Sequence, residues 1–148
     1  MRRLPSAPRA ATRRLHECSL ELEVPFHDVD AQQIVWHGHY FKYLELARTQ
    51  LLRGLGLDTG HFAALRVQLV VVDSACRYLA PLRYADRLRV SAWIRDFTHR
   101  IAIDYAIQDL THQRPAARAH TILACITPEG RILHRTPAAL RERLAPCS

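Results

Sequence analysis

Residues 39–55 read HYFKYLELARTQLLRGL and have the pattern of a long helix. It contains no proline, and its apolar side chains recur at the spacing of an α-helix. One row consists of Tyr40, Leu44, Ala47, Leu51 and Leu55, and a second of Phe41, Leu44 and Leu52. Gly54 and Gly56 are placed to end the helix. Because the apolar arc is wide, we expect a sheet to wrap around this helix rather than to lie against one side of it.

The segments on either side of the helix show the alternation of β-strands. Before it, residues 18–26 place Leu20, Leu22, Val24 and Phe26 on one face, which predicts a half-buried strand. After it, the predicted strands are residues 67–79, 88–97, 101–110 and 119–127, with turns at 81–86, 111–115 and 128–130 and a little more strand at 131–134. This order predicts an α+β fold in which a mostly antiparallel sheet curls around one central helix.

The length of 148 residues and the 49% apolar content are those of a single domain with one core. The first 14 residues, MRRLPSAPRAATRR, are basic and contain two prolines, so a flexible tail is favoured over a targeting segment. We therefore expect a basic tail at residues 1–16, the folded domain at 17–136, and a tail or short helix at 137–148.

The chain is basic, with a formal net charge of +7, and of its 21 basic residues all but Lys42 are arginine. A phosphate-bearing partner is plausible, but charge alone does not decide it. Nucleic acid is disfavoured because the arginines are spread along the chain without a recognised binding motif. The four scattered cysteines predict a reduced, cytoplasmic protein, and no apolar run is long enough to predict a membrane span.

Titratable residues crowd into HDVDAQQIVWHGHY, residues 27–40, directly before the predicted helix. A carboxylate at Asp30 can face the helix N-terminus, where free N–H groups and the helix dipole favour negative charge. Such an arrangement can polarise a carbonyl beside a carboxylate base or nucleophile. A capping or loop role for Asp30 is the commoner alternative when the sequence is considered alone.

These residues also resemble the signature of a known family. The resemblance rests on Asp28-Val29-Asp30-Ala31-x-x-Ile34-Val35-Trp36-His37-x-x-Tyr40, then Tyr43-x-Glu45-x-Ala47-Arg48, and later Arg77-Tyr78-Leu79-Ala80-Pro81 with Tyr84-x-Asp86-x-Leu88. It is similar to the hotdog-fold thioesterases of the 4-hydroxybenzoyl-CoA thioesterase and short acyl-CoA thioesterase family, over roughly residues 18–128. The resemblance implies a hotdog fold, a curved antiparallel sheet of about five to six strands around one long helix, which agrees with the order of elements above.

The resemblance implies a thioester hydrolase that acts on acyl-CoA or on an acyl-carrier protein. Asp30 would be the general base or nucleophile and His37 a supporting catalytic residue, with backbone N–H groups of residues 37–39 stabilising the oxyanion. The substrate-binding candidates are Tyr40, His39, Arg95, His99 and Arg100. For the last three, a role as solvated surface side chains is the main alternative.

Other implications concern assembly and cofactors. The resemblance implies a homodimer or homotetramer. We expect no cofactor, and we expect no metal because His37 and His39 lack a third ligand nearby in the sequence. Two rival functions stay open: a non-catalytic acyl-thioester-binding hotdog protein and a hotdog hydratase or dehydratase.

The sequence departs from the family pattern at two places. Gln32 and Gln33 stand where the family usually has one or two glycines, which allow positive φ angles and close approach of a ligand. His39 stands where the family often has asparagine, a better helix N-cap. The glutamine pair is the departure that bears most on the shape of the loop after Asp30 and on the fit of the substrate.

Overall fold

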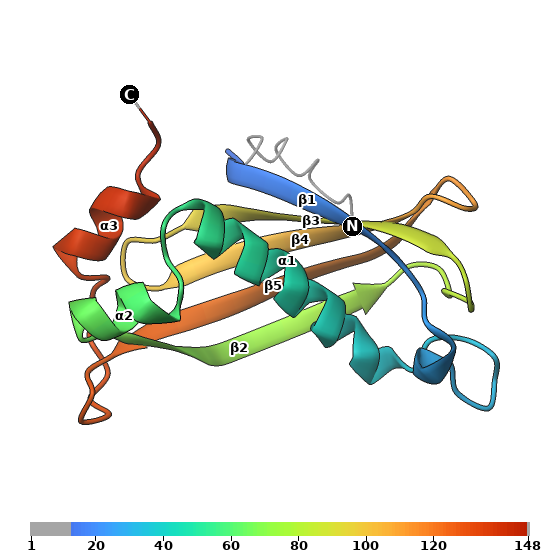
Figure 1. Cartoon of the computed structure of the whole chain (residues 1–148), viewed down its shortest axis with the longest axis horizontal. Coiled ribbons are helices and arrows are strands. Elements are labelled where there is room, and N and C mark those ends of the chain that lie inside the picture. Colours follow the sequence, from blue (N-terminus) through green and yellow to red (C-terminus); the bar gives the residue numbers. More distant parts are fainter. Residues whose placement is uncertain (1–12, 148) are drawn as a thin grey trace, which may run out of the picture.

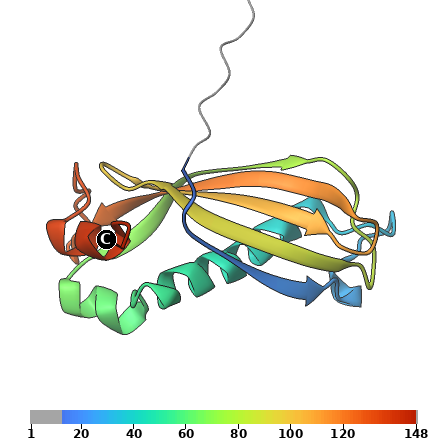
Figure 2. The ribbon, with the colours of Figure 1, turned by 90° about the horizontal axis from the view of Figure 1, so that it is seen from above.

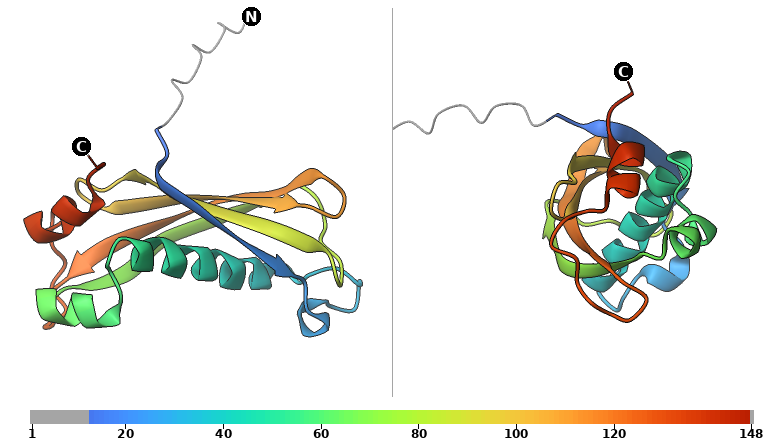
Figure 3. Two further views of the ribbon diagram at one scale, coloured as in Figure 1. Left: turned by 45° about the horizontal axis from the view of Figure 1, so that its top comes forward. Right: turned by 90° about the vertical axis from the view of Figure 1, so that its left-hand side faces the viewer.

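Five antiparallel strands form one curved sheet around a single long helix (Figure 1; Figure 3). The structure is a computed structural model and describes residues 13–147. The strands are β1 (Leu15–Glu23), β2 (Gln68–Tyr78), β3 (Arg87–Asp96), β4 (Ile101–Asp109) and β5 (Arg114–Ile126). Their order across the sheet is β1-β3-β4-β5-β2, so β1 and β2 are the two edges. The predicted α+β hotdog fold is confirmed.

The long helix α1 (Tyr40–Gly54) lies on the concave side of the sheet (Figure 2). It follows a short 3₁₀ turn, η2 (His37–His39). Tyr40, Leu44, Ala47 and Leu51 are buried, as the first apolar row predicts. Phe41 is 39% exposed, so the second row is only partly covered.

The first strand is shorter than the alternation predicts. β1 ends at Glu23, and Phe26 lies in a 3₁₀ turn, η1 (Phe26–Asp28), where it is 75% exposed. The prediction that Phe26 is buried in the strand is therefore wrong. Pro25 separates the two elements, and proline cannot donate a ladder hydrogen bond.

Two elements differ from the pattern after α1. β5 begins at Arg114 instead of residue 119, because Pro115 sits at a register shift beside Gln108, where a missing N–H is tolerated. A short helix, α2 (Thr59–Leu65), was not predicted. It begins with a capping box between Asp58 and His61, which supplies hydrogen bonds to the first turn.

The C-terminal segment packs against the domain. Helix α3 (Ala138–Leu144) buries Leu140 and Leu144 completely, whereas residues 131–134 contribute only the single bridge between Ile126 and Ile132. At the other end, Leu15 and His16 belong to β1, and residues 1–12 of the expected tail lie outside the described residues. None of the helices in the described part of the chain is long and apolar enough to cross a membrane.

Candidate active site

Asp30 is held in a tight turn within residues 29–35. Its N–H donates to the carbonyl oxygen of Ile34 (2.9 Å), and its own carbonyl accepts the N–H of Gln33 (2.9 Å). The side-chain Oδ1 accepts the N–H of Gln32 at 2.8 Å. Asp30 is half-buried, and the three hydrogen bonds fix the positions of its backbone and its carboxylate.

The glutamine pair preserves a loop shape that glycine would favour. Gln33 has a φ of 65°, in the left-handed region that side chains with a Cβ seldom adopt. Glycine adopts such a φ angle without strain, so the turn has a shape suited to glycine although the residue is glutamine.

Asp28 anchors the same loop to α1. Its buried carboxylate accepts hydrogen bonds from Lys42 Nζ (2.5 Å) and from the hydroxyl of Tyr43 (2.6 Å). Burial by itself would raise the pKa of Asp28, but the bonds from Lys42 and Tyr43 outweigh it and hold the pKa below its ordinary value. The Asp28 carbonyl also accepts the N–H of Trp36 at 3.0 Å. Asp28 is therefore a charged structural anchor.

A cleft of about 380 Å³ opens at the start of α1. It brings together Asp30, His37 and Tyr40, three residues predicted from the sequence. The remaining lining residues are Gln32, Ile34, Val35, Tyr78, Leu79, Ala80 and Pro81. Tyr78 donates its hydroxyl to the carbonyl of His37 at 2.7 Å, and its ring meets that of Tyr40 edge to face at 4.7 Å. The end of β2 thus closes the cleft against the helix start.

The helix start offers hydrogen-bond donors beside this cleft. The first bond of the 3₁₀ turn runs from the N–H of His39 to the carbonyl of Trp36 (2.9 Å), so the N–H groups of His37 and Gly38 have no acceptor within the helix. A Cβ on Gly38 would lie 2.2 Å from the Trp36 ring, which explains the glycine. Burial raises the pKa of Tyr40 to about 12, and its hydroxyl stays protonated at neutral pH.

Two of the other predicted residues lie away from the cleft. The His39 ring is directed toward Asp28, with Nε2 4.0 Å from Oδ1. Arg95 lies on the sheet face opposite α1, where its Nε donates to both carboxylate oxygens of Asp104 at 3.1 and 3.0 Å.

His99 and Arg100 lie at the opposite end of the sheet, in the β3–β4 turn near α3 (Figure 1). Their side chains contact the carbonyls of His134 (3.3 Å) and Leu133 (2.9 Å). The structure does not bring this pair to the cleft.

The sequence did not identify the roles of Asp28, Lys42 and Tyr78. Lys42 and Tyr43 are adjacent in α1 and both bind Asp28, a pairing that helical spacing cannot reveal because Asp28 lies in a separate loop. Tyr78 had a usable signal, since strand alternation places it on the same face as Cys76, toward the core.

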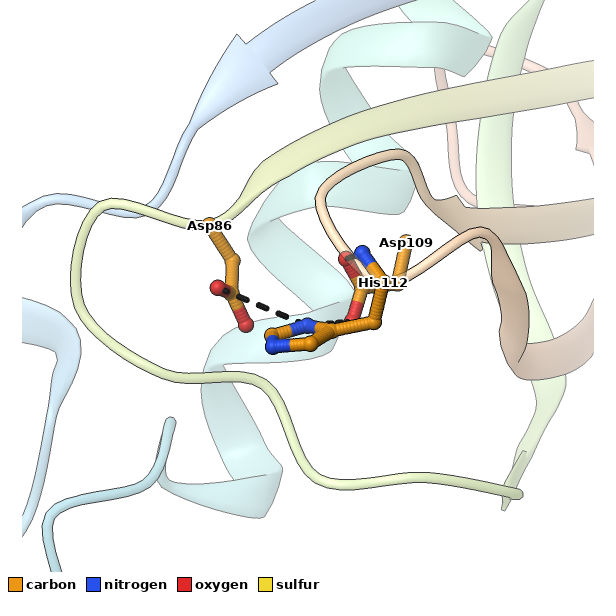
Figure 4. Close-up of side chains that lie close together, drawn as sticks. All are labelled: Asp86, Asp109 and His112. Atoms are coloured by element: carbon orange, nitrogen blue, oxygen red, sulfur yellow. Dashed lines mark hydrogen bonds and ion pairs between the residues drawn. The ribbon is translucent and has the colours of Figure 1, made fainter.

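One group in the described residues has the donor types of a metal site: Asp86, Asp109 and His112 (Figure 4). Asp109 Oδ2 lies 2.8 Å from His112 Nδ1, and Asp86 Oδ2 accepts the N–H of Arg83 at 2.9 Å. Arg114 adds positive charge, with Nε 3.7 Å from Asp109. His112 Nδ1 also lies 3.8 Å from Asp86 Oδ1, and this contact joins the β2–β3 turn to the β4–β5 turn.

Comparison with known proteins assigns the chain to a family. The family model described as the thioesterase-like superfamily matches residues 24–144. The chain belongs to the thioesterase-like superfamily. Among curated members of related sequence, a putative esterase of Synechocystis is 28% identical over 95% of this chain and 92% of that protein. A putative acyl-CoA thioesterase of Bacillus subtilis is 32% identical over 56% of this chain and 60% of its own length.

Solved structures show the same fold as this member of the thioesterase-like superfamily. A 1,4-dihydroxy-2-naphthoyl-CoA thioesterase from Synechocystis has a TM-score of 0.76 and 24% identity, covering 86% of this chain and 95% of that one. A 4-hydroxybenzoyl-CoA thioesterase in complex with 4-hydroxybenzoyl-CoA has a TM-score of 0.79 and 17% identity, covering 88% and 99%. At these identities the likeness establishes the hotdog fold.

Proposed function

We propose that this protein hydrolyses an acyl thioester, carried by coenzyme A or by an acyl-carrier protein, to a free acid and a thiol. The observation that carries the proposal is the cleft lined by both Asp30 and His37 at the start of α1, where the N–H groups of His37 and Gly38 have no acceptor within the helix. Membership of the thioesterase-like superfamily supports it, as do relatives named acyl-CoA thioesterase and acyl-CoA thioester hydrolase.

In the proposed reaction the thioester carbonyl carbon lies beside Asp30, and its oxygen faces the N–H groups of His37 and Gly38. Asp30 either removes a proton from water as water attacks, or attacks directly to give a mixed anhydride that water then hydrolyses. In both routes the C–S bond breaks, the thiolate leaves with the carrier and takes up a proton, and oxygen from water enters the acid. A single backbone donor to the oxyanion is typically worth about 10²–10³ in rate.

His37 is proposed to support the reaction through its ring, which lines the cleft. The alternative is that only its main chain contributes, since Tyr78 fixes its carbonyl. His37→Ala separates the two, because the substitution keeps the N–H and removes the imidazole. Loss of kcat by about tenfold or more supports a role for the ring; unchanged kinetics would leave His37 as a backbone donor only.

The proposal is tested by thiol release from a panel of acyl-CoA and acyl-carrier-protein thioesters that includes aromatic, short-chain and long-chain acyl groups. We expect catalytic turnover of at least one group, with free acid formed in equal amount. Binding without turnover would instead indicate a non-catalytic acyl-thioester sensor. Addition of water to the acyl chain, or its removal, while the thioester stays intact would indicate a hydratase or dehydratase.

We also propose that the protein works as a homodimer or homotetramer in the cytoplasm. β2 is a sheet edge, and Val71 and Val72 on it are 51% and 50% exposed, as expected of a strand that pairs with another copy. The four cysteines are unpaired, which suits a reducing compartment.

A further inference from the structure

A groove of about 1060 Å³ lies on the sheet face opposite α1. Its lining residues include Arg77, Trp93, Arg95, Arg118 and His120. The position follows from strand alternation: Cys76 and Tyr78 face the core and α1, so Arg77 between them faces outward. The groove is therefore separate from the catalytic cleft and more basic.

Only part of this basic charge is balanced by acids. Arg95 is bound by Asp104, and His120 Nε2 lies 3.2 Å from Asp73 Oδ2. Within residues 13–147, neither Arg77 nor Arg118 pairs with an acidic side chain. The groove thus holds two guanidinium groups whose charge is available to a ligand.

These two arginines also face each other. Arg77 and Arg118 are direct partners in the β2–β5 ladder, and both are exposed. Side chains directly opposite in such a ladder lie about 4.5–5.5 Å apart at Cβ, and like charges there are destabilising. An anion between them would convert this repulsion into attraction, and phosphate oxygens suit the planar guanidinium fork.

The groove and the cleft are close along the chain. Arg77 immediately precedes Tyr78, which lines the cleft, and Leu79, Ala80 and Pro81 continue the cleft wall beyond the end of β2. The route from the cleft to Arg77 and Arg118 therefore runs past the end of β2.

We propose that Arg77 and Arg118 bind phosphate on the carrier arm of the thioester substrate. The inference rests on the proposed function, since the thioester would occupy the cleft while its arm passes the end of β2. The phosphates belong either to the nucleotide of coenzyme A or to the phosphopantetheine of a carrier protein. Both sources present the same chemistry to the two arginines.

Kinetics with three thioesters of one acyl group test the site: acyl-CoA, acyl-phosphopantetheine, and acyl-N-acetylcysteamine, which has no phosphate. The variant is Arg77→Ala with Arg118→Ala. The matched control is Arg131→Ala with Arg135→Ala, which removes the same charge from two exposed residues outside the groove. Circular dichroism checks that both variants fold.

We expect the groove variant to raise the KM for acyl-CoA by about tenfold or more and to leave acyl-N-acetylcysteamine kinetics unchanged. If the KM for acyl-phosphopantetheine rises by the same factor, the arginines bind the phosphate of phosphopantetheine. If only the KM for acyl-CoA rises, they bind the phosphates of the nucleotide. Unchanged KM for acyl-CoA, or an equal loss with acyl-N-acetylcysteamine, overturns the inference.

Direct binding separates this inference from the proposed function. Calorimetry with adenosine 3′,5′-bisphosphate, which has no thioester, should show binding to the wild type and to the control, and at least tenfold weaker binding to the groove variant. Failure of all three thioesters to react would overturn the proposed function alone. Equal binding of the bisphosphate to wild type and groove variant would overturn the phosphate site.

Discussion

At the scale of single residues, two aspartates two positions apart have different surroundings. Asp28 is buried and held by Lys42 and Tyr43. Asp30 lines the cleft, and within residues 13–147 its carboxylate accepts a single hydrogen bond, from the N–H of Gln32. A carboxylate committed to two strong donors is poorly placed to take a proton or to attack a carbonyl. The difference in partners therefore favours Asp30 for chemistry and Asp28 for structure.

Gln33→Gly should increase stability, because Gln33 holds a positive φ angle that glycine adopts without steric strain. We expect the free energy of unfolding to rise by up to about 1 kcal/mol in urea denaturation. Gln32→Gly is the matched control; its φ is not positive, and we expect a loss of about 0.5 kcal/mol. If Gln33→Gly destabilises more than the control, strain at this position is not relieved by glycine.

At the scale of elements, the site lies where four segments meet: the loop after β1, the start of α1, the end of β2 and the β2–β3 turn. The loop after β1 is bound to the β2–β3 turn by the N–H of Val35 and the carbonyl of Leu82 (2.8 Å), and to the end of β2 by Tyr78. Periodicity predicted the helix and the strands because their patterns are local. It did not predict the contact between Tyr78 and His37, which are 41 residues apart, or the α2 helix, which has only 7 residues.

Asp28→Asn should weaken the junction between this loop and α1. The lowered pKa of Asp28 means that its stabilisation is present above its ordinary pKa near 4 and is lost as the pH falls through the lower folded value. At pH 7 we expect a loss of about 1–3 kcal/mol in the free energy of unfolding. Below about pH 4 the difference between wild type and variant should shrink.

Thermal or urea unfolding across pH 2–8 measures this effect. Glu142→Gln is the control, because Glu142 is an exposed side chain on α3 whose charge is fully solvated. We expect the control to change stability much less. A constant gap between wild type and Asp28→Asn from neutral to acid pH would show that the charge of Asp28 does not hold the junction.

At the scale of the whole molecule, one sheet encloses one helix and leaves β2 open as an edge. The sequence predicted three site residues close to the helix start, which its pattern marks clearly. All three line the same cleft: Asp30, His37 and Tyr40. The side-chain neighbours on the outward face of the sheet could not be predicted from the sequence. The pairing of Arg77 with Arg118 depends on the register between strands separated by two others in the sequence.

Val72→Arg should disrupt assembly if copies pair along β2, since it places a charge on an exposed apolar edge. Sedimentation should give a dimer or tetramer for the wild type and a species near the chain mass of 17.0 kDa for the variant. Leu46→Arg is the control, because Leu46 is 54% exposed but lies on the side of α1 that faces β1. A wild type that sediments as a monomer contradicts the proposed assembly.

Asp30 is proposed to carry out thioester hydrolysis, so steady-state thiol release should differ sharply between wild type and Asp30→Asn. With the best acyl-CoA from the panel, we expect kcat to fall by about 10²–10⁴, while Asp58→Asn retains wild-type rates. Because asparagine keeps the size of the side chain and its acceptor for Gln32, the fold should be unchanged. Wild-type turnover by Asp30→Asn would rule out a catalytic role for this carboxylate.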